Sequence, residues 1–120
     1  MSSFTRKPRV YCAGPITKGD LLGNVRAGID ATEKLRKLGF DVFCPHLSAY
    51  YQVIYEVPYE EWLEYDFNWI RVCDAVYRMP GESAGADREE AFAKGASKPI
   101  FFSVEDLVRW RDNRSFYSWD

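Results

Sequence analysis

The stretch SAGADREEAFA at 83–93 places two adjacent glutamates among small and apolar residues. If this stretch is helical, Glu89 shares a face with Phe92, while Glu90 lies on another face, four residues before Lys94. We therefore expect Glu90 to form a surface ion pair with Lys94. Glu89 would instead lie on the stripe that packs against the rest of the protein, where an unpaired carboxylate costs on the order of several kcal/mol. Glu89 is thus either a catalytic carboxylate or a structural acid with a partner.

A second acid, Asp66, occupies a similar position in the stretch 58–73. It is in helical register with apolar residues such as Trp62 and so interrupts an apolar face. One interpretation is an exposed acid at the edge of the stripe, paired with Arg71; the other is a carboxylate with a chemical role. Asp74 follows the stretch directly, and we expect it to accept a turn hydrogen bond from the backbone.

Three further places in the sequence could bind a ligand. Ser83 is a natural N-cap, and the small residues after it, Gly85 among them, leave backbone N–H groups uncovered, which can hold a phosphate. Capping alone would equally explain Ser83, because the stretch matches no known phosphate-loop motif. The loop 14–19 has two glycines and Lys18 and could close over an anion. His46, the only histidine, is either a ligand contact or a hydrogen-bonding loop residue.

Short apolar stretches alternate with amphipathic helical patterns along the chain. The patterns predict strands at 9–13, 40–44, 74–79 and 98–102, helices at 21–38, 58–73, 84–94 and 104–110, and an irregular tyrosine-rich stretch at 50–55. This alternation indicates an α/β fold, a flavodoxin-like or Rossmann-like three-layer sandwich with a four- to five-stranded parallel sheet. Ligands of such sheets bind at the carboxyl ends of the strands. The loops after Ala13, Cys44 and Met79 are therefore the expected site.

Length and composition favour one domain, 1–120, with a small-molecule partner. The 16 basic and 18 acidic residues nearly balance, and no long basic cluster stands out, which argues against a nucleic-acid or membrane footprint. The three cysteines lie in apolar surroundings without a C-x-x-C spacing, so we expect buried reduced thiols and no metal site. The N-terminal residues carry no apolar signal segment, and a cytoplasmic location is expected.

Four stretches together resemble the nucleoside 2-deoxyribosyltransferase superfamily. They are VYCAGPITKG at 10–19, DVFCPH at 41–46, YDFNWIRVCDAV at 65–76 and SAGADREEAFA at 83–93. The resemblance covers about residues 9–103 and is closest to the small phage- and bacteria-type members and to the 2′-deoxynucleoside 5′-phosphate N-hydrolases. In these a Y-x-x-G-x-I loop, a D-x-x-W/L-x-x-x-D segment and an S-x-G-x-x-x-E motif recur in this order. The resemblance implies that Glu89 attacks C1′ of the sugar, that Asp66 holds sugar hydroxyls and assists proton transfer, and that Tyr11 hydrogen-bonds the nucleophile.

The same resemblance implies which residues contact the substrate, whether a cofactor is needed and how the chain assembles. Substrate contacts are expected from Ser83, Gly85, Gly14, Ile16, Thr17 and His46. Ser83 matches a serine that contacts a 5′-phosphate, which favours a nucleoside monophosphate, while an arginine of that group is replaced here around Thr17 and Lys18. No metal and no cofactor are implied. The family implies a homodimer in which a neighbouring subunit supplies a polar side chain, with Asn113 and Ser115 as candidates.

The expected function is cleavage of the N-glycosidic bond of a (deoxy)nucleoside 5′-monophosphate through a glycosyl-glutamate intermediate, releasing a free nucleobase. Two alternatives stay open: a deoxyribosyltransferase that exchanges bases, and a non-catalytic nucleotide-binding module on the same fold. A third interpretation takes the aromatic stretch 50–62 as a docking surface for a partner. Tyr50, Tyr51, Tyr55 and Trp62 are accordingly walls for the nucleobase or contacts in a dimer.

Overall fold

A four-stranded parallel sheet with the order β3-β2-β4-β5 forms the centre of the protein, in a computed structural model that describes residues 3–114 and 117–119. The strands are β2 Arg9–Ala13, β3 Asp41–Phe43, β4 Ala75–Arg78 and β5 Ile100–Phe101. The helices are α1 Leu21–Lys37, the 3-10 helix η1 Pro45–Leu47, α2 Ser48–Ile54, α3 Tyr59–Val72, α4 Ala84–Gly95 and α5 Val104–Asp112. Two short strands, β1 Ser3–Thr5 and β6 Tyr117–Trp119, form a separate antiparallel pair.

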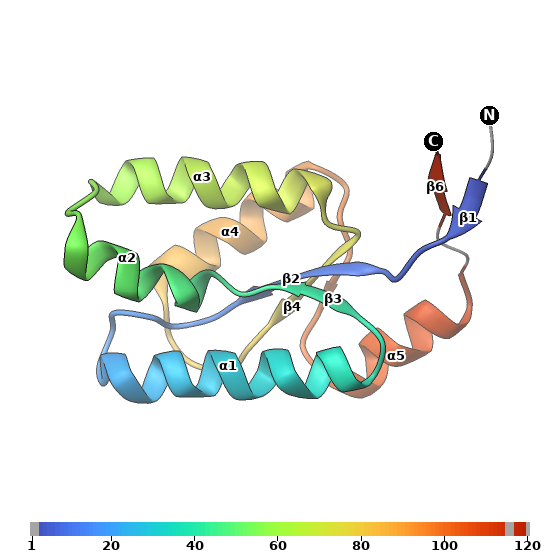
Figure 1. The fold of residues 1–120 in the computed structure, drawn as a ribbon, viewed down its shortest axis with the longest axis horizontal. Helices are drawn as coiled ribbons and strands as arrows, with labels where there is room; N and C mark the ends of the chain where they lie inside the picture. The colour runs from blue at the N-terminus through green and yellow to red at the C-terminus, as the bar shows by residue number, and fades with distance from the viewer. Residues whose placement is uncertain (1–2, 115–116, 120) are drawn as a thin grey trace.

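Helices cover both faces of the parallel sheet, as Figure 1 shows with α3 and α4 on one side and α1 and α5 on the other. Alternate residues of β2 face the two layers, as the pleat of a strand requires. Tyr11 packs in the cluster with Ile70 of α3, whereas Val10 packs in the cluster with Leu35 of α1 and Leu107 of α5. The predicted three-layer, flavodoxin-like α/β fold is therefore confirmed, with four parallel strands.

The strand order reverses at β2, which pairs with β3 on one side and with β4 on the other. The loops after β2 and β4 leave the sheet next to each other, and two glycines let them touch. A Cβ on Gly14 would lie 2.9 Å from the Met79 side chain, and a Cβ on Gly81 would lie 2.8 Å from Pro15. Gly81 also has φ +115°, which favours glycine. Packing thus fixes the bases of both loops at the edge where ligands bind in this fold.

The eight predicted strands and helices agree with the structure to within about two residues at each end, but β1, β6, η1 and α2 were not predicted. The tyrosine-rich stretch that we expected to be irregular forms α2 instead. Its apolar residues lie on all sides without helical periodicity, and Tyr50, Val53 and Ile54 remain exposed. Among the described residues, no helix is both long enough and apolar enough to cross a membrane.

Candidate functional site

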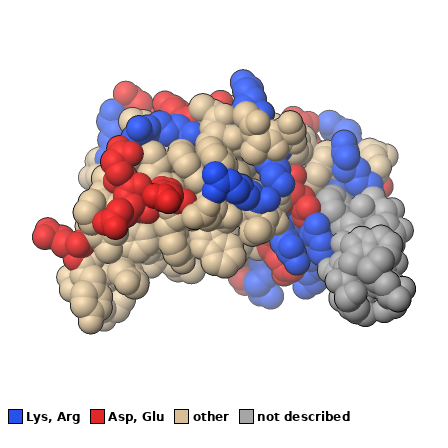
Figure 2. Space-filling model, turned by 90° about the horizontal axis from the view of Figure 1, so that it is seen from above, with Lys and Arg blue, Asp and Glu red and all other residues tan. Residues whose placement is uncertain are grey.

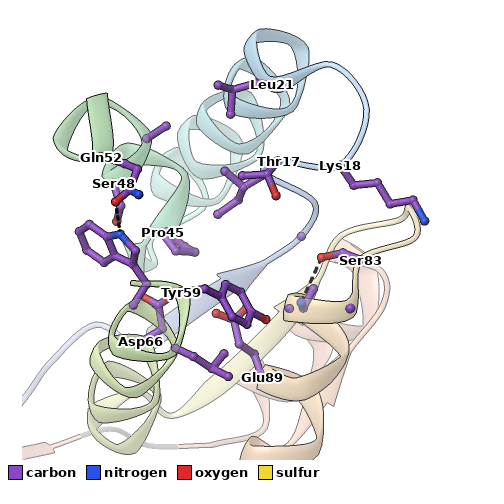
Figure 3. A pocket seen from close by; sticks show the side chains of 18 of the residues that line it. Thr17, Lys18, Leu21, Pro45, Ser48, Gln52, Tyr59, Asp66, Ser83 and Glu89 are labelled. Atoms are coloured by element: carbon purple, nitrogen blue, oxygen red, sulfur yellow. Dashed lines mark hydrogen bonds between the residues drawn. The ribbon is translucent and has the colours of Figure 1, made fainter. Parts of the chain in front are cut away.

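A cavity of about 750 Å³ opens at the carboxyl ends of β2 and β4, between α2, α3 and the start of α4 (Figure 3). Its volume is in the range of small-molecule sites. Of the residues that the sequence singled out, the cavity lining contains Gly14, Ile16, Thr17, Asp66, Ser83, Gly85 and Glu89. The structure therefore brings together side chains from two loops and two helices that are up to about 75 residues apart in the sequence, as expected for a site at the edge of a parallel sheet.

Three polar groups meet at the inner end of this cavity. Tyr11 is fully buried in β2, and its hydroxyl donates a hydrogen bond of 2.6 Å to Oε2 of Glu89 on α4. Asp66 on α3 lines the same cavity and is only 8% exposed, and its Oδ1 has no hydrogen-bond partner among the described residues. A buried acceptor without a partner is costly unless a ligand satisfies it. Asp66 thus has an acceptor available for a hydroxyl group of a bound molecule.

Burial governs the protonation of this carboxyl pair. Desolvation raises the pKa of Glu89 above its ordinary value, and the neighbouring Asp66 raises it further, while the hydrogen bond from Tyr11 opposes the rise. Desolvation likewise raises the pKa of Asp66. The pair therefore holds one proton over part of the pH range in which ordinary carboxyls are ionised. Burial raises the pKa of Tyr11 well above 10, so its hydroxyl remains a donor.

Hydrogen-bond donors gather at the other end of the cavity, at the N-terminus of α4. Ser83 caps the helix by accepting from the Ala86 N–H at 3.1 Å, which leaves its own O–H free to donate. The N–H groups of Ala84 and Gly85 precede the first intrahelical bond. Gly85 also lies beneath the Tyr59 hydroxyl, which would be 3.2 Å from a Cβ at that position. This end of the cavity has the donors that an anionic group requires.

Arg78 at the end of β4 is a buried cation that organises the loop before α4. Its guanidinium donates to the carbonyls of Met79 at 2.5 Å and Gly81 at 3.0 Å, and to Oδ1 of Asp87 at 3.0 Å. Its Nε lies 3.6 Å from Oε1 of Glu90. The prediction that Glu90 pairs with Lys94 was therefore wrong. Arg78 is nearer because it projects from the strand end toward the first turns of α4.

Replacing Arg78 with methionine should destabilise the protein by about 2–3 kcal/mol, because it leaves two loop carbonyls and two acids without their donor. Thermal or urea unfolding at pH 7 measures the change. Asp87→Asn is the matched control: Asp87 is 67% exposed, so its loss should cost less than about 1 kcal/mol. An Arg78→Met protein as stable as the wild type would show that Arg78 does not hold the loop.

A hydrogen-bonded glutamine fixes the apolar wall of the cavity. Oε1 of Gln52 on α2 accepts from Trp62 Nε1 at 2.5 Å and from the Val57 N–H at 3.0 Å. The indole of Trp62 lines the cavity, as one of the interpretations of the aromatic stretch required. Tyr50, Tyr51 and Tyr55 do not line it and are 73%, 53% and 66% exposed. Of the four aromatic residues, only Trp62 is therefore placed to contact a ligand.

His46 lies behind the cavity wall and is not part of its lining. The ring is fully buried against α1, where a Cβ on Gly28 would collide with it, and Nε2 is 3.1 Å from the Pro15 carbonyl. Burial lowers the pKa of His46, so the neutral ring donates this bond. His46 therefore supports the loop after β2. It does not line the cavity, as a direct contact with substrate would require.

Other predicted residues also have defined environments. Asp74 accepts from the Arg9 N–H of β2 at 2.7 Å and pairs with Arg6, so its backbone partner is distant in the sequence and the predicted turn hydrogen bond was wrong. Asp66 is buried, so the interpretation as an exposed acid paired with Arg71 was wrong; Arg71 instead donates to Asn68. The three cysteines are buried free thiols. Within the ranges that the structure describes, no group of three or more His, Cys, Asp or Glu side chains could hold a metal ion.

Asn113 and Ser115 were the candidates for completing the site of a neighbouring subunit, and Asn113 is not part of the cavity lining of its own chain. Asn113 directly follows α5, and its Nδ2 donates to the Arg109 carbonyl at 2.8 Å. Ser115 lies outside the described residues.

Sequence reasoning missed several lining residues, notably Tyr59, Gln52 and Glu82. Gln52 lies on the helix that the periodicity did not reveal. Tyr59 follows Pro58 at the start of a helix, and its aromatic side chain could not be told apart in the sequence from the other apolar residues of that helix. Glu82 directly precedes the Ser83 cap, and this adjacency to the motif is the signal that could have identified it.

Comparisons with known proteins place this geometry in context. The family described as "Domain of unknown function (DUF4406)" matches residues 8–102. A search of curated proteins finds no match. Among the 15 solved chains that match is a 2-deoxyribosyltransferase from the psychrotolerant bacterium Bacillus psychrosaccharolyticus. It is similar over 83% of this chain and 78% of its own, with a TM-score of 0.59 and 21% identity. At this identity the similarity establishes a shared fold.

Proposed function

Because the chain belongs to the DUF4406 family, whose description assigns no activity, we propose its function from the cavity itself: cleavage of the N-glycosidic bond of a (deoxy)nucleoside 5′-monophosphate. One observation carries the proposal. Glu89 and Asp66 are both buried at the inner end of one cavity, Tyr11 donates to Glu89, and donors for an anion lie at the other end. The similar fold of a 2-deoxyribosyltransferase supports a substrate of the nucleoside class.

In the first step, a carboxylate oxygen of Glu89 bonds to C1′ of the sugar as the bond from C1′ to the base nitrogen breaks. The electron pair of that bond leaves with the base, which takes up a proton. Burial keeps one proton on the carboxyl pair, and it raises the pKa of Glu89 further than that of Asp66. The reactive form is the one in which this proton is on Asp66, which donates it to the base, while Glu89 is ionised. The hydrogen bond from Tyr11 favours the ionised form of Glu89 and orients its second oxygen toward the sugar.

In the second step, water attacks C1′ of the glycosyl ester and the Glu89 carboxylate is released. The Asp66 carboxylate accepts the proton of the water, so the enzyme returns to its starting state. The sugar is held between steps by Asp66 Oδ1, which is available to accept a hydroxyl, and its phosphate by the Ser83 end of the cavity. Trp62 and the apolar wall near it receive the base.

The second candidate is a transferase, in which an acceptor base replaces water in the second step. The similar fold of a 2-deoxyribosyltransferase favours it. Chromatography of incubations with deoxynucleoside monophosphates and the matching nucleosides tests both candidates. Release of free base without an acceptor supports hydrolysis, whereas product that forms only with an added second base supports transfer. If neither is seen with any substrate, the proposed activity is wrong.

Replacing Tyr11 with phenylalanine should move the acid limb of the kcat/KM profile to higher pH by about one unit. The reactive carboxyl pair carries one proton, on Asp66, with Glu89 ionised, so activity is lost as the pH falls and the pair binds a second proton. The hydrogen bond from Tyr11 favours the ionised form of Glu89, so its loss raises the pKa at which the second proton binds. Phenylalanine keeps the ring that stacks on Phe43. A limb that stays in place, or that moves to lower pH, would contradict this role of the hydroxyl.

A further inference from the structure

An ion pair crosses the mouth of the cavity between the two ligand loops. Nζ of Lys18, from the loop after β2, lies 2.9 Å from Oε1 of Glu82, from the loop after β4. Both residues line the cavity. Figure 3 shows Lys18 reaching toward the loop that leads into Ser83, on the side of the cavity where the donors of α4 begin. The pair therefore spans the entrance beside the predicted anion site.

The charges around this entrance make Lys18 distinctive. It is the one cation among the described lining residues, which also include the acids Asp66, Glu82, Asp87 and Glu89. Seen from the side of α3 and α4, acidic side chains also gather over the end of the molecule where α3 begins (Figure 2). Among the described lining residues, Lys18 is therefore the cation that can join the donors of α4 in binding an anionic group, and Glu82 occupies Lys18 in the free protein.

The two acids beside the α4 N-terminus differ in how they are held. Asp87 is bound to buried Arg78 at 3.0 Å, which fixes it and neutralises its charge. Glu82 has an 82% exposed side chain, and its ion pair is with Lys18, which is itself 59% exposed. Exposed pairs of this kind contribute at most about fivefold to an equilibrium constant. Glu82 can thus leave Lys18 at small cost, whereas Asp87 stays in place.

The loop bases beneath the pair are held by packing and by a hydrogen bond, so we expect the exchange to involve only side chains. Gly14 packs on Met79, Gly81 packs on Pro15, and Arg78 bonds the Gly81 carbonyl. The Lys18 ammonium therefore stays near the entrance whichever anion it contacts. A phosphate monoester would meet it together with the Ser83 hydroxyl and the N–H groups of α4.

We propose that the Lys18–Glu82 pair is a selectivity latch: the 5′-phosphate of a substrate displaces the Glu82 carboxylate from Lys18, and a substrate without the phosphate does not. This inference rests on the proposed function, because it concerns the substrate of the same cavity. Glu82 occupies the place of the phosphate at Lys18 in the free protein, so it lowers the affinity of the cavity for anions, each of which has to replace it. Lys18 thus provides the preference for nucleotides over nucleosides, and Glu82 limits that preference to groups that bind Lys18 more strongly than a carboxylate does.

Calorimetric titration tests the latch without turnover, in a Glu89→Gln background. The probes are the four common 2′-deoxynucleoside 5′-monophosphates, the matching nucleosides and inorganic phosphate. Glu82→Gln should bind the monophosphates about two- to fivefold more tightly. Lys18→Met should weaken their binding about tenfold or more relative to the nucleosides. In the double variant the gain from Glu82→Gln should disappear, because the pair acts through Lys18.

Glu64→Gln is the matched control, since Glu64 is an exposed glutamate outside the cavity lining. It should leave all affinities unchanged. The latch is overturned if Glu82→Gln leaves monophosphate binding unchanged or weaker, if it tightens nucleosides equally, or if neither monophosphates nor phosphate bind. Base release by the chain with Glu89 intact is measured separately. If base release is absent but the titrations follow the expected pattern, the proposed function fails and the latch stands.

Discussion

Replacing Glu89 with glutamine should lower the rate of base release by at least about 10³-fold, whereas Glu90→Gln should stay within about tenfold of the wild type. The two neighbours differ in what they touch. Glu89 lines the cavity and accepts from Tyr11, while Glu90 is directed to Arg78 behind the loop. Glutamine keeps the size of each side chain and an oxygen acceptor, but an amide cannot attack C1′. Initial rates with a monophosphate substrate measure both variants.

The Glu89→Gln protein should be folded at least as well as the wild type at pH 8 and above. The folded-state pKa of Glu89 is raised, so the stability linked to its proton is present at low pH and is lost as the pH rises through that value. The amide of glutamine does not ionise and so avoids this loss of stability. Melting temperatures across pH 5–9 therefore show whether a lower rate of Glu89→Gln comes from lost chemistry or from unfolding. A Glu89→Gln rate close to that of the wild type would remove Glu89 from the mechanism. A loss at Glu90→Gln as large as that at Glu89→Gln would indicate that Arg78 supports the reaction.

The helical periodicity of α4 is enough by itself to separate these two glutamates. A helix that packs on a sheet buries one stripe, and Glu89 is on that stripe while Glu90 is beside it. The same reasoning wrongly predicted Lys94 as the partner of Glu90, because helical spacing identifies only neighbours on the same helix. Arg78 comes from β4, twelve residues earlier in the chain, and only the crossover from β4 to α4 brings it close.

The parallel sheet and its covering helices were predictable because its strands are short apolar stretches and most helices carry a clear apolar period; the β1–β6 pair was not predicted. The cavity was predictable only in part. The residues at its inner end lie on predicted strands and helices, whereas part of its wall is formed by α2 and by loops, which the apolar patterns do not reveal. Gln52 belongs to a short helix whose apolar residues have no periodic face, and its bond to Trp62 joins α2 to α3. The Lys18–Glu82 pair joins two loops that have no local signal for each other. Contacts between loops follow from the sheet order, which spacing along the chain does not encode.

Replacing Asp66 with asparagine should lower kcat by about 10²- to 10³-fold with a much smaller change in KM. The carbonyl oxygen of asparagine can still accept the sugar hydroxyl that Asp66 Oδ1 is placed to bind. The amide cannot give a proton to the departing base or take one from water, so the loss should fall on the chemical steps. Asp66→Ala removes the acceptor as well and should raise KM in addition. Steady-state rates for the two variants separate these effects.

Unfolding measurements are the control for the Asp66 variants, because burial also raises the folded-state pKa of Asp66. The stability linked to that proton is lost as the pH rises through the folded-state pKa, so Asp66→Asn should unfold at the same temperature as the wild type or higher at pH 7–8. A large loss of kcat in a protein of undiminished stability would establish proton transfer by Asp66. If Asp66→Asn raised KM and left kcat within about threefold, Asp66 would only bind the sugar, and the proton for the base would come from another group.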